Sequence, residues 1–247
     1  MKKYEIKLNR RDFLKSSSMI GISSIAPGVF FQELAHGRAL DEPASNKIRW
    51  GMLINTNQCS DECDACVTAC NEENGIEDFG RPTTDTQWIR KLKLTNDASG
   101  ETINVPMMCQ HCENPPCVDV CPTGASFVRA DGIVLVNKHT CIGCRYCMMS
   151  CPYKARSFVH ENLENQLPHA PRGKGCVESC NLCVHKIDNG DNSTACSEAC
   201  QKDGQQAILF GDLNDSESEI SKQLKKYKTT EVRSDLGLNT AVRYRGI

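Results

Sequence analysis

Cysteine is the residue type in this chain that could do chemistry, and one run of cysteines has a spacing that is known from metal sites. Cys141, Cys144, Cys147 and Cys151 form a C-x2-C-x2-C-x3-C run that Pro152 follows. In bacterial ferredoxins this spacing holds a [4Fe–4S] cluster, and the fourth cysteine ligates the other cluster of a pair. One such run therefore predicts a second run close by in the fold.

A second run with the same ending lies just upstream and begins at Cys109. Its middle gap is longer, but it closes with the same C-x3-C-P pattern at Pro122. If the two runs exchange their fourth cysteines, they hold two inner clusters. The ligands of one cluster would be Cys109, Cys112, Cys117 and Cys151, and those of its neighbour would be Cys121, Cys141, Cys144 and Cys147.

Two outer runs flank this inner pair. The first gap of the Cys59 run is one residue longer than the usual pattern, and in the last run Gln201 stands where the inner runs have proline. The same exchange predicts a third cluster on Cys59, Cys63, Cys66 and Cys200, and a fourth on Cys70, Cys180, Cys183 and Cys196. A total of three clusters is the alternative, because the Cys59 run is irregular.

Cys176 is left over from these sets. It continues the spacing of the Cys59 run, because Cys176, Cys180 and Cys183 are also separated by three and two residues. A second register of ligation, with Cys176 as a ligand, therefore stays open. We favour a buried thiol that binds no metal, because a free cysteine behaves as a small hydrophobic residue.

The composition excludes several other classes of protein. The 247 residues include 17 cysteines and carry a formal net charge of −2, which gives no reason to expect nucleic acid as a partner. Zinc sites usually separate C-x2-C pairs by a dozen or more residues, so zinc and a disulfide framework both fit these crowded runs poorly. Because aromatic residues are only 6% of the chain, bound metal is expected to supply part of the cohesion of the fold.

These runs predict an α+β fold with little regular structure, made of two tandem ferredoxin-like modules that hold two [4Fe–4S] clusters each. The expected parts are a signal at 1–39, the start of an outer module at 40–104, a central module at 105–160, the completion of the outer module at 161–212 and a C-terminal tail at 213–247. No nucleophile–base pair, phosphate loop or paired carboxylates are recognisable. Because each cluster has four cysteines available, we expect an electron-transfer subunit and not an enzyme.

Short strands should position the runs. Strands are expected at 49–55, 87–94, 155–159 and 206–210, and the Asp131–Gly132 pair predicts a hairpin over 125–136. Ser216 and Glu219 have the spacing of a capping box at the start of a helix that extends through Lys228. His111 and His139, beside cysteines of the inner runs, are expected to tune cluster potentials as neighbours and not to ligate iron.

The first residues have the pattern of an export signal. Asn9-Arg10-Arg11-Asp12-Phe13 resembles a twin-arginine core, and no charged residue occurs from Ser16 to Gln32. That stretch is shorter than the roughly 20 residues of a membrane span, so we favour a signal over a membrane anchor. Twin-arginine export carries proteins that are already folded and loaded with cofactor, so the clusters would form before the chain reaches the periplasm, at the outer face of the cytoplasmic membrane.

From Met52 to Tyr244 the chain resembles the four-cluster electron-transfer subunits of the DMSO-reductase and polysulfide-reductase type. The segments Pro106–Ala125 and Cys141–Pro152 carry the resemblance almost residue for residue. It implies two ferredoxin-like modules, four [4Fe–4S] clusters on the ligand sets given above, and a docked integral membrane subunit of the NrfD type that handles quinol. It also implies a haem-bearing partner, such as a multihaem cytochrome c, and membrane association through the partner.

Two other functions stand beside this one. Within the same class, the chain would serve a molybdopterin reductase for tetrathionate or polysulfide. In a different class, it would be an interaction scaffold stabilised by zinc. The first differs in its partner, and the second in the metal that the cysteines bind.

Overall fold

The described part of the chain comprises residues 42–164, 166–203 and 205–247 of a computed structural model. These residues belong to one structural unit. The expected export signal, residues 1–39, lies outside the described residues, so it stays a prediction.

Short strands and helices alternate with long loops, as expected for an α+β fold with little regular structure. The strands are β1 (Trp50–Asn55), β2 (Ile89–Thr95), β3 (Thr102–Met108), β4 (Ser126–Val128), β5 (Val134–Val136), β6 (Ser157–Phe158), β7 (Val177–Glu178), β8 (Ile208–Asp212) and β9 (Val242–Arg245). The helices are η1 (Thr56–Gln58), α2 (Ala65–Asn74), α3 (Pro116–Asp119), α4 (Tyr146–Ser150), α5 (Val184–Asp188), α6 (Ala195–Lys202), α7 (Glu219–Lys226) and η2 (Ser234–Leu236).

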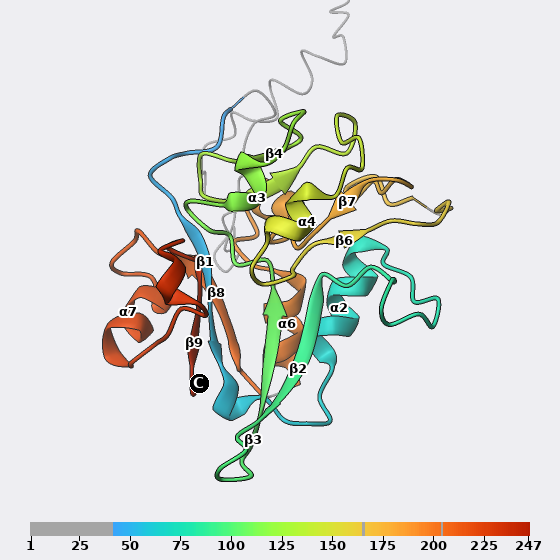
Figure 1. The fold of residues 1–247 in the computed structure, drawn as a ribbon. Coiled ribbons are helices and arrows are strands. Elements are labelled where there is room, and N and C mark those ends of the chain that lie inside the picture. Colours follow the sequence, from blue (N-terminus) through green and yellow to red (C-terminus); the bar gives the residue numbers. More distant parts are fainter. Residues whose placement is uncertain (1–41, 165, 204) are drawn as a thin grey trace, which may run out of the picture. The chain divides into compact units, whose positions relative to one another are not determined.

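Strand β1 lies in the middle of a three-stranded sheet with the order β8-β1-β9 (Figure 1). β8 runs antiparallel to β1, with Trp50 opposite Asp212, and β9 runs parallel to it, with Met52 opposite Val242. Almost every side chain of β1 is buried, which accounts for its continuous apolar sequence. Because β9 comes from residues 213–247, the segment expected as a tail supplies a strand of this sheet.

Gly51 allows the chain that leads into β9 to lie close to β1. A Cβ atom at this position would clash with the backbone oxygen of Ala241 and with the Leu213 side chain. Glycine has no such atom, and the N–H of Met52 donates to the same Ala241 oxygen at 3.0 Å. The sequence Trp50-Gly51-Met52 therefore fixes how the C-terminal strand enters the sheet.

The other expected strands form two-stranded pairs. β2 and β3 are a long antiparallel ribbon in which Ile89 lies opposite Met108, and it stands apart from the β1 sheet in Figure 1. β4 and β5 form the predicted hairpin, whose turn places Gly132 at a φ of +84°. That φ favours glycine, which confirms the role of the Asp131–Gly132 pair. Of the strand expected at 155–159, only β6 forms, paired with β7.

The cap of helix α7 differs from the expected one. Its N-cap is Ser218, whose Oγ accepts a hydrogen bond from the N–H of Ser221 at 3.2 Å. The prediction of a capping box from Ser216 was therefore wrong by two residues. Ser218 is the N-cap because its hydroxyl also donates a hydrogen bond to the backbone oxygen of Asp212 at 2.7 Å. This bond fixes the start of the helix against the end of β8.

A buried ion-pair network joins segments that lie far apart in the sequence. Glu178 is fully buried, and its carboxylate accepts hydrogen bonds from Arg172 Nε at 3.0 Å and from the Trp88 indole at 3.3 Å. The Lys138 ammonium lies 3.4 Å from the same carboxylate. Arg172 also donates to the backbone oxygen of Gly75 at the end of α2. This network therefore connects the segment that follows the first cysteine run to the segments that precede the Cys141 run and the Cys180 run.

Replacing Glu178 with alanine should lower stability by about 3–5 kcal/mol, because Arg172 and Lys138 would keep buried charges without a counter-ion. The measurement is the urea midpoint of the cluster-loaded protein, followed anaerobically by loss of visible absorbance. Glu217→Ala is the control, because its pair with Lys222 is exposed and is worth about 1 kcal/mol at most. Equal midpoints for the two variants would contradict this assignment.

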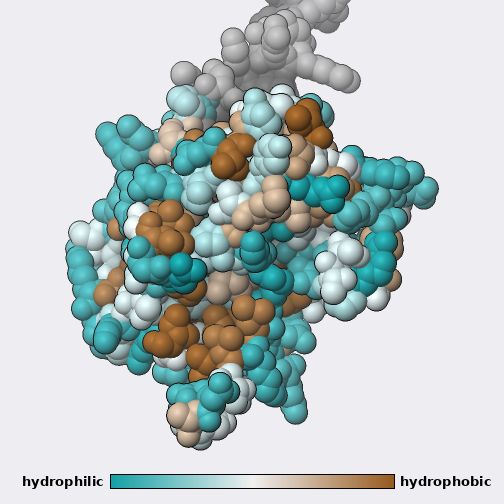
Figure 2. All heavy atoms as spheres, in the orientation of Figure 1, coloured by the Kyte–Doolittle hydropathy of each residue, from teal (hydrophilic) through white to brown (hydrophobic). Residues whose placement is uncertain are grey.

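Apolar side chains on the surface gather in several separate patches on the face drawn in Figure 2, with hydrophilic residues between them. In the part of the chain that the structure describes, no helix combines the length and apolar character of a membrane span.

Candidate metal centres

Helices α2 and α6 present four of the sixteen predicted ligands. Cys66 and Cys70 lie four residues apart on α2, and Cys196 and Cys200 lie four residues apart on α6. Residues at this spacing lie on one face of a helix, one turn apart. The two helices pack against each other and lie side by side in Figure 1. Each helix can therefore supply one thiol to each of two adjacent sites.

The first outer group contains the irregular run. Burial raises the pKa of the Cys66 thiol to about 12, and Cys196, Cys59, Cys200 and Cys63 add to the rise. Burial also raises the pKa of Cys59, which Lys91 lowers and which Cys63 and Cys200 raise further. Cys59, Cys63 and Cys200 are thus all near Cys66, and so is Cys196 of the second outer group, whose effect on Cys66 is the largest of the four.

The second outer group lies between this one and the inner cysteines. Burial raises the pKa of Cys70 well above its usual range, followed by the effects of Cys196 and Cys183. The pKa of Cys180 is raised in the same way, by burial and then by Cys70, Cys196 and Cys109. The structure therefore gathers Cys70, Cys180, Cys183 and Cys196, and it places Cys180 beside a thiol of the inner pair.

One inner group is buried around α3. Burial raises the pKa of Cys112 to about 12, and Cys109, Cys117 and Cys151 each add to the rise. These are the other three cysteines of the predicted set. Cys117 is also affected by Cys147 of the neighbouring group, so the two inner groups are adjacent.

The last group surrounds one small cavity that Cys121, Cys141, Cys144 and Cys147 all line. Cys144 is exposed, so this group reaches the protein surface. The pKa of Cys121 is raised by burial, but hydrogen bonds from Ser126 and Thr123 outweigh this effect and hold it at about 7. These donors favour the thiolate, which is the form that binds iron.

The four groups fit [4Fe–4S] clusters better than single zinc ions. Thiolates on one zinc lie about 3.8 Å apart, because each Zn–S bond is about 2.3 Å. Among the described residues, no three cysteine sulfurs lie within 4.8 Å of one another. All seventeen cysteines lie in the described residues, and none is in a disulfide. Wider spacing is what an iron–sulfur cube requires of its ligands, since the cube stands between them.

Arg156 is a buried cation between the two inner groups. Only 5% of the residue is exposed, and its guanidinium donates to Cys117 Sγ at 3.1 Å and to Ser126 Oγ at 2.8 Å. Burial lowers the pKa of Arg156, but Cys117, Cys109 and Cys147 outweigh this effect and raise the pKa above its usual value. In the part of the chain that the structure describes, it forms no ion pair with a carboxylate. Its charge is therefore balanced by cysteines of both inner groups.

Sequence reasoning did not single out Arg156. The available signal was one arginine inside the short apolar stretch 155–159, directly after the Cys141 run. A charged side chain in such a stretch is buried only when it has a partner. Here the partners are thiols that reach it from two separate runs.

His111 also has a structural contact that the sequence did not predict. Its Nδ1 accepts a hydrogen bond from the N–H of Val134 at 3.0 Å, and burial followed by the charge of Arg156 lowers its pKa to about 3. The ring is therefore neutral. The ring connects the Cys109 run to strand β5. Burial raises the pKa of Cys109 to about 12, while Arg156 and a hydrogen bond from the backbone N–H of His111 oppose this rise. His111 is therefore a hydrogen-bonding neighbour of the Cys109 thiol, and its effect on cluster potential stays a prediction.

Cys176 lies beside the last group, although it precedes the Cys180 run in sequence. Its thiol donates to the backbone oxygen of Lys138 at 3.3 Å. Burial raises its pKa, and Cys141 and Glu178 add to the rise. The register in which Cys176 replaces a ligand of an outer cluster gains no support from this position.

Cys176→Ser should leave the iron content per chain unchanged, because the serine hydroxyl can keep the bond to Lys138 and no cluster loses a ligand. Iron and acid-labile sulfide in anaerobically purified variant and wild-type protein measure this. Loss of about four irons per chain, the content of one cube, would show that Cys176 is a cluster ligand and would contradict this prediction.

Gln201 lets the α6 run end differently from the inner runs. Helix α6 continues past Cys200 to Lys202, whereas α4 ends at Ser150, before Cys151 and Pro152. Proline and the residue before it disfavour helical continuation, and glutamine does not. The missing proline therefore lengthens a helix and leaves the grouping of Cys200 unaffected.

Comparison with known proteins extends these observations. The family model described as "4Fe-4S dicluster domain" matches residues 101–212, which contain both inner runs and the last outer run. The chain is 41% identical to the Hdr-like menaquinol oxidoreductase iron-sulfur subunit 1 of Archaeoglobus fulgidus, over 82% of this chain and 85% of the relative.

Two further relatives come from bacteria. Protein NrfC of Escherichia coli is 36% identical over 78% of each chain. A tetrathionate reductase subunit of Salmonella typhimurium is 35% identical over 74% of this chain and 66% of the relative. The similarity thus extends well beyond the matched domain and includes the first outer run.

Proposed function

Because this chain belongs to the family of iron–sulfur electron-transfer subunits of oxidoreductase complexes that includes NrfC, we propose that it conducts electrons through four [4Fe–4S] clusters in series. Such a cluster exchanges one electron at a time. The subunit itself is not the catalytic one, and its cofactors are multiple [4Fe–4S] clusters. The observation that carries the proposal is the set of four thiol groups, each adjacent to the next.

The ligand sets are those that the spacing predicts. Each cluster takes three ligands from its own run and one from the partner run. The sets are Cys59, Cys63, Cys66 and Cys200; Cys70, Cys180, Cys183 and Cys196; Cys109, Cys112, Cys117 and Cys151; and Cys121, Cys141, Cys144 and Cys147. Mutual effects of these thiols on one another's pKa support each set.

The order along the chain of clusters follows from thiols of different sets that are neighbours. Cys66 is close to Cys196, Cys180 is close to Cys109, and Cys117 is close to Cys147. The Cys59 set is therefore at one end of the series and the Cys141 set at the other. Electrons would enter at one end and leave at the other.

The Cys141 end has the features of a contact with a partner. Cys144 is exposed, and three large apolar side chains beside it are also exposed: Ile142 by 67%, Met149 by 64% and Tyr146 by 54%. Apolar and aromatic side chains around a redox centre favour a dry contact with a partner. We assign this end to a redox partner of the complex.

The physiological setting that fits best is a sulfur-metabolism complex of the Dsr type. The expected twin-arginine signal, with the segments at 50–54, 152–158 and 211–215, is most like DsrO, the periplasmic subunit of that complex. Its electrons would pass between a quinone-interacting membrane subunit of the NrfD type and a haem-bearing partner, at the outer face of the cytoplasmic membrane.

A molybdopterin reductase complex is the second candidate. Similarity to the tetrathionate reductase subunit favours it, and the same cluster series would serve there. The two candidates differ in the cofactor of the partner, which is haem in the first and molybdenum in the second.

The test is purification of the tagged chain from its native membranes in mild detergent, under anaerobic conditions. The Dsr-type proposal predicts a co-purified integral membrane subunit and haem absorbance without molybdenum. About one molybdenum atom per complex, without haem, would contradict the Dsr-type proposal and support the molybdopterin reductase complex. Met149→Glu should release the partner at the Cys141 end, whereas Leu94→Glu, at another exposed apolar residue on β2, should retain it.

A further inference from the structure

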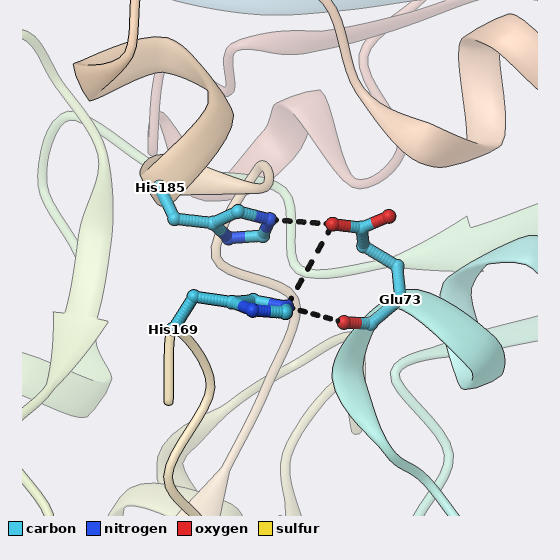
Figure 3. A group of neighbouring side chains, drawn as sticks. All are labelled: Glu73, His169 and His185. Atoms are coloured by element: carbon cyan, nitrogen blue, oxygen red, sulfur yellow. Dashed lines mark hydrogen bonds and ion pairs between the residues drawn. The ribbon is translucent and has the colours of Figure 1, made fainter. Parts of the chain in front are cut away.

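Three side chains that the cluster series does not use converge on one point of the surface (Figure 3). Glu73 lies near the end of α2, His185 lies on α5, and His169 lies on the loop between β6 and β7. His169 and His185 follow Glu73 by 96 and 112 residues along the chain. No sequence pattern predicts this group, because only the fold brings its three residues together.

The ligand atoms of the three residues are close enough to share one ion. His185 Nε2 lies 2.6 Å from Glu73 Oε1, and His169 Nε2 lies 3.7 Å from the same oxygen. One ligand atom from each residue lies within 4.8 Å of the other two. Ligands around a tetrahedral zinc ion are about 3.3–3.5 Å apart, because Zn–N and Zn–O bonds are about 2.0–2.2 Å long. His169 Nε2 also forms a hydrogen bond with the backbone oxygen of Glu73 at 2.8 Å. The His169 ring must therefore turn from this oxygen toward the carboxylate to complete the geometry.

The ligand types indicate which ions would bind. Two imidazole nitrogens and one carboxylate oxygen suit borderline transition metals such as zinc, and suit calcium or magnesium poorly. This set differs from the cluster sites, which offer thiolates only. An ion here would replace the proton between His185 and Glu73.

The surroundings leave room for further ligands. His169 and Glu73 line a surface hollow of about 510 Å³, which Glu72 and Glu198 also line. The cations near it are Lys202, at the edge of the hollow, and Lys186, which pairs with Glu198 at 3.0 Å. The three carboxylates thus outnumber the two ammonium groups, and water can fill the open positions of an ion.

We propose that Glu73, His169 and His185 form a mononuclear site for a divalent transition-metal ion, with zinc as the best match, separate from the iron–sulfur clusters. The ion would tie the loop of His169 to helices α2 and α5. This site does not depend on the proposed electron transfer.

The experiment is equilibrium dialysis of the cluster-loaded protein against Zn²⁺ under anaerobic conditions, with zinc and iron counted in the same sample. The wild-type protein should bind about one zinc per chain with its iron unchanged. His169→Ala and Glu73→Gln should each weaken zinc binding at least about tenfold, since loss of even an outer partner of a metal site costs that much.

His160→Ala is the matched control, because His160 is an exposed histidine outside the group, and it should bind zinc as the wild type does. His169 is the most informative position, because it is the member of the group furthest in sequence from any predicted cluster ligand, and its loss should leave the iron content intact. Equal zinc affinity in wild type and His169→Ala would overturn the proposal. Zinc uptake matched by an equal loss of iron would overturn it too, since the zinc would then be at the cysteines.

Discussion

Replacing Cys112 with serine is expected to remove one inner [4Fe–4S] cluster and to lower the yield of loaded protein. Cys112 is a predicted ligand whose thiol lies among Cys109, Cys117 and Cys151. Thiolate is the ligand that holds such clusters, so serine should leave the site incomplete. Because metal binding and folding are coupled, the loss should spread to the neighbouring clusters.

Iron and sulfide per chain measure this effect, together with the yield of soluble protein. A loss of at least about four irons is expected, the content of one cube. Cys176→Ser is the matched control, since it makes the same chemical change at a thiol outside the four sets. A Cys112→Ser protein with the full iron content of the control would contradict the inner ligand set.

Replacing Arg156 with glutamine is expected to lower the reduction potentials of both inner clusters by roughly 100 mV. A positive charge about 7 Å from a cluster, at an effective dielectric constant of about 20, stabilises an added electron by about 2.4 kcal/mol. Since 59 mV corresponds to a tenfold change for one electron, this energy converts to about 100 mV. Both inner clusters should shift because Arg156 lies close to Cys117 and to Cys147.

An anaerobic redox titration followed by EPR measures the shift. Arg156→Lys should restore most of the potential, because it keeps the charge. Arg129→Gln is the control, because Arg129 is partly buried and pairs with Asp131 and Asp188, so its charge is already balanced. Unshifted inner potentials in Arg156→Gln would show that the guanidinium serves the fold alone.

The sequence predicted the parts of this protein that depend on local pattern. The cysteine spacings indicated the family and the cofactor, because a loop around a cluster must bring three thiols to one place within few residues. The Asp131–Gly132 pair predicted a hairpin that the structure confirms, because only glycine readily adopts the φ of its turn. The strand at β1 was recognisable for a similar reason, from its continuous apolar residues.

Features that depend on distant contacts were not predictable from one sequence. Val242–Arg245 gave no local sign that it would pair with β1, almost two hundred residues earlier. Glutamate is a residue type that is mostly exposed, yet Glu178 is buried because Arg172, Lys138 and Trp88 converge on it. Cys176 shows the same limit. Its spacing suggests the outer clusters, whereas the fold places it beside Cys141.

The four ligand sets determine how many clusters the protein holds. Iron and acid-labile sulfide per chain, measured on protein purified anaerobically, test this number most directly. Four cubes predict about sixteen of each. About twelve of each would contradict the four-cluster series and point to an empty Cys59 site, and zinc in place of iron would contradict the electron-transfer function itself.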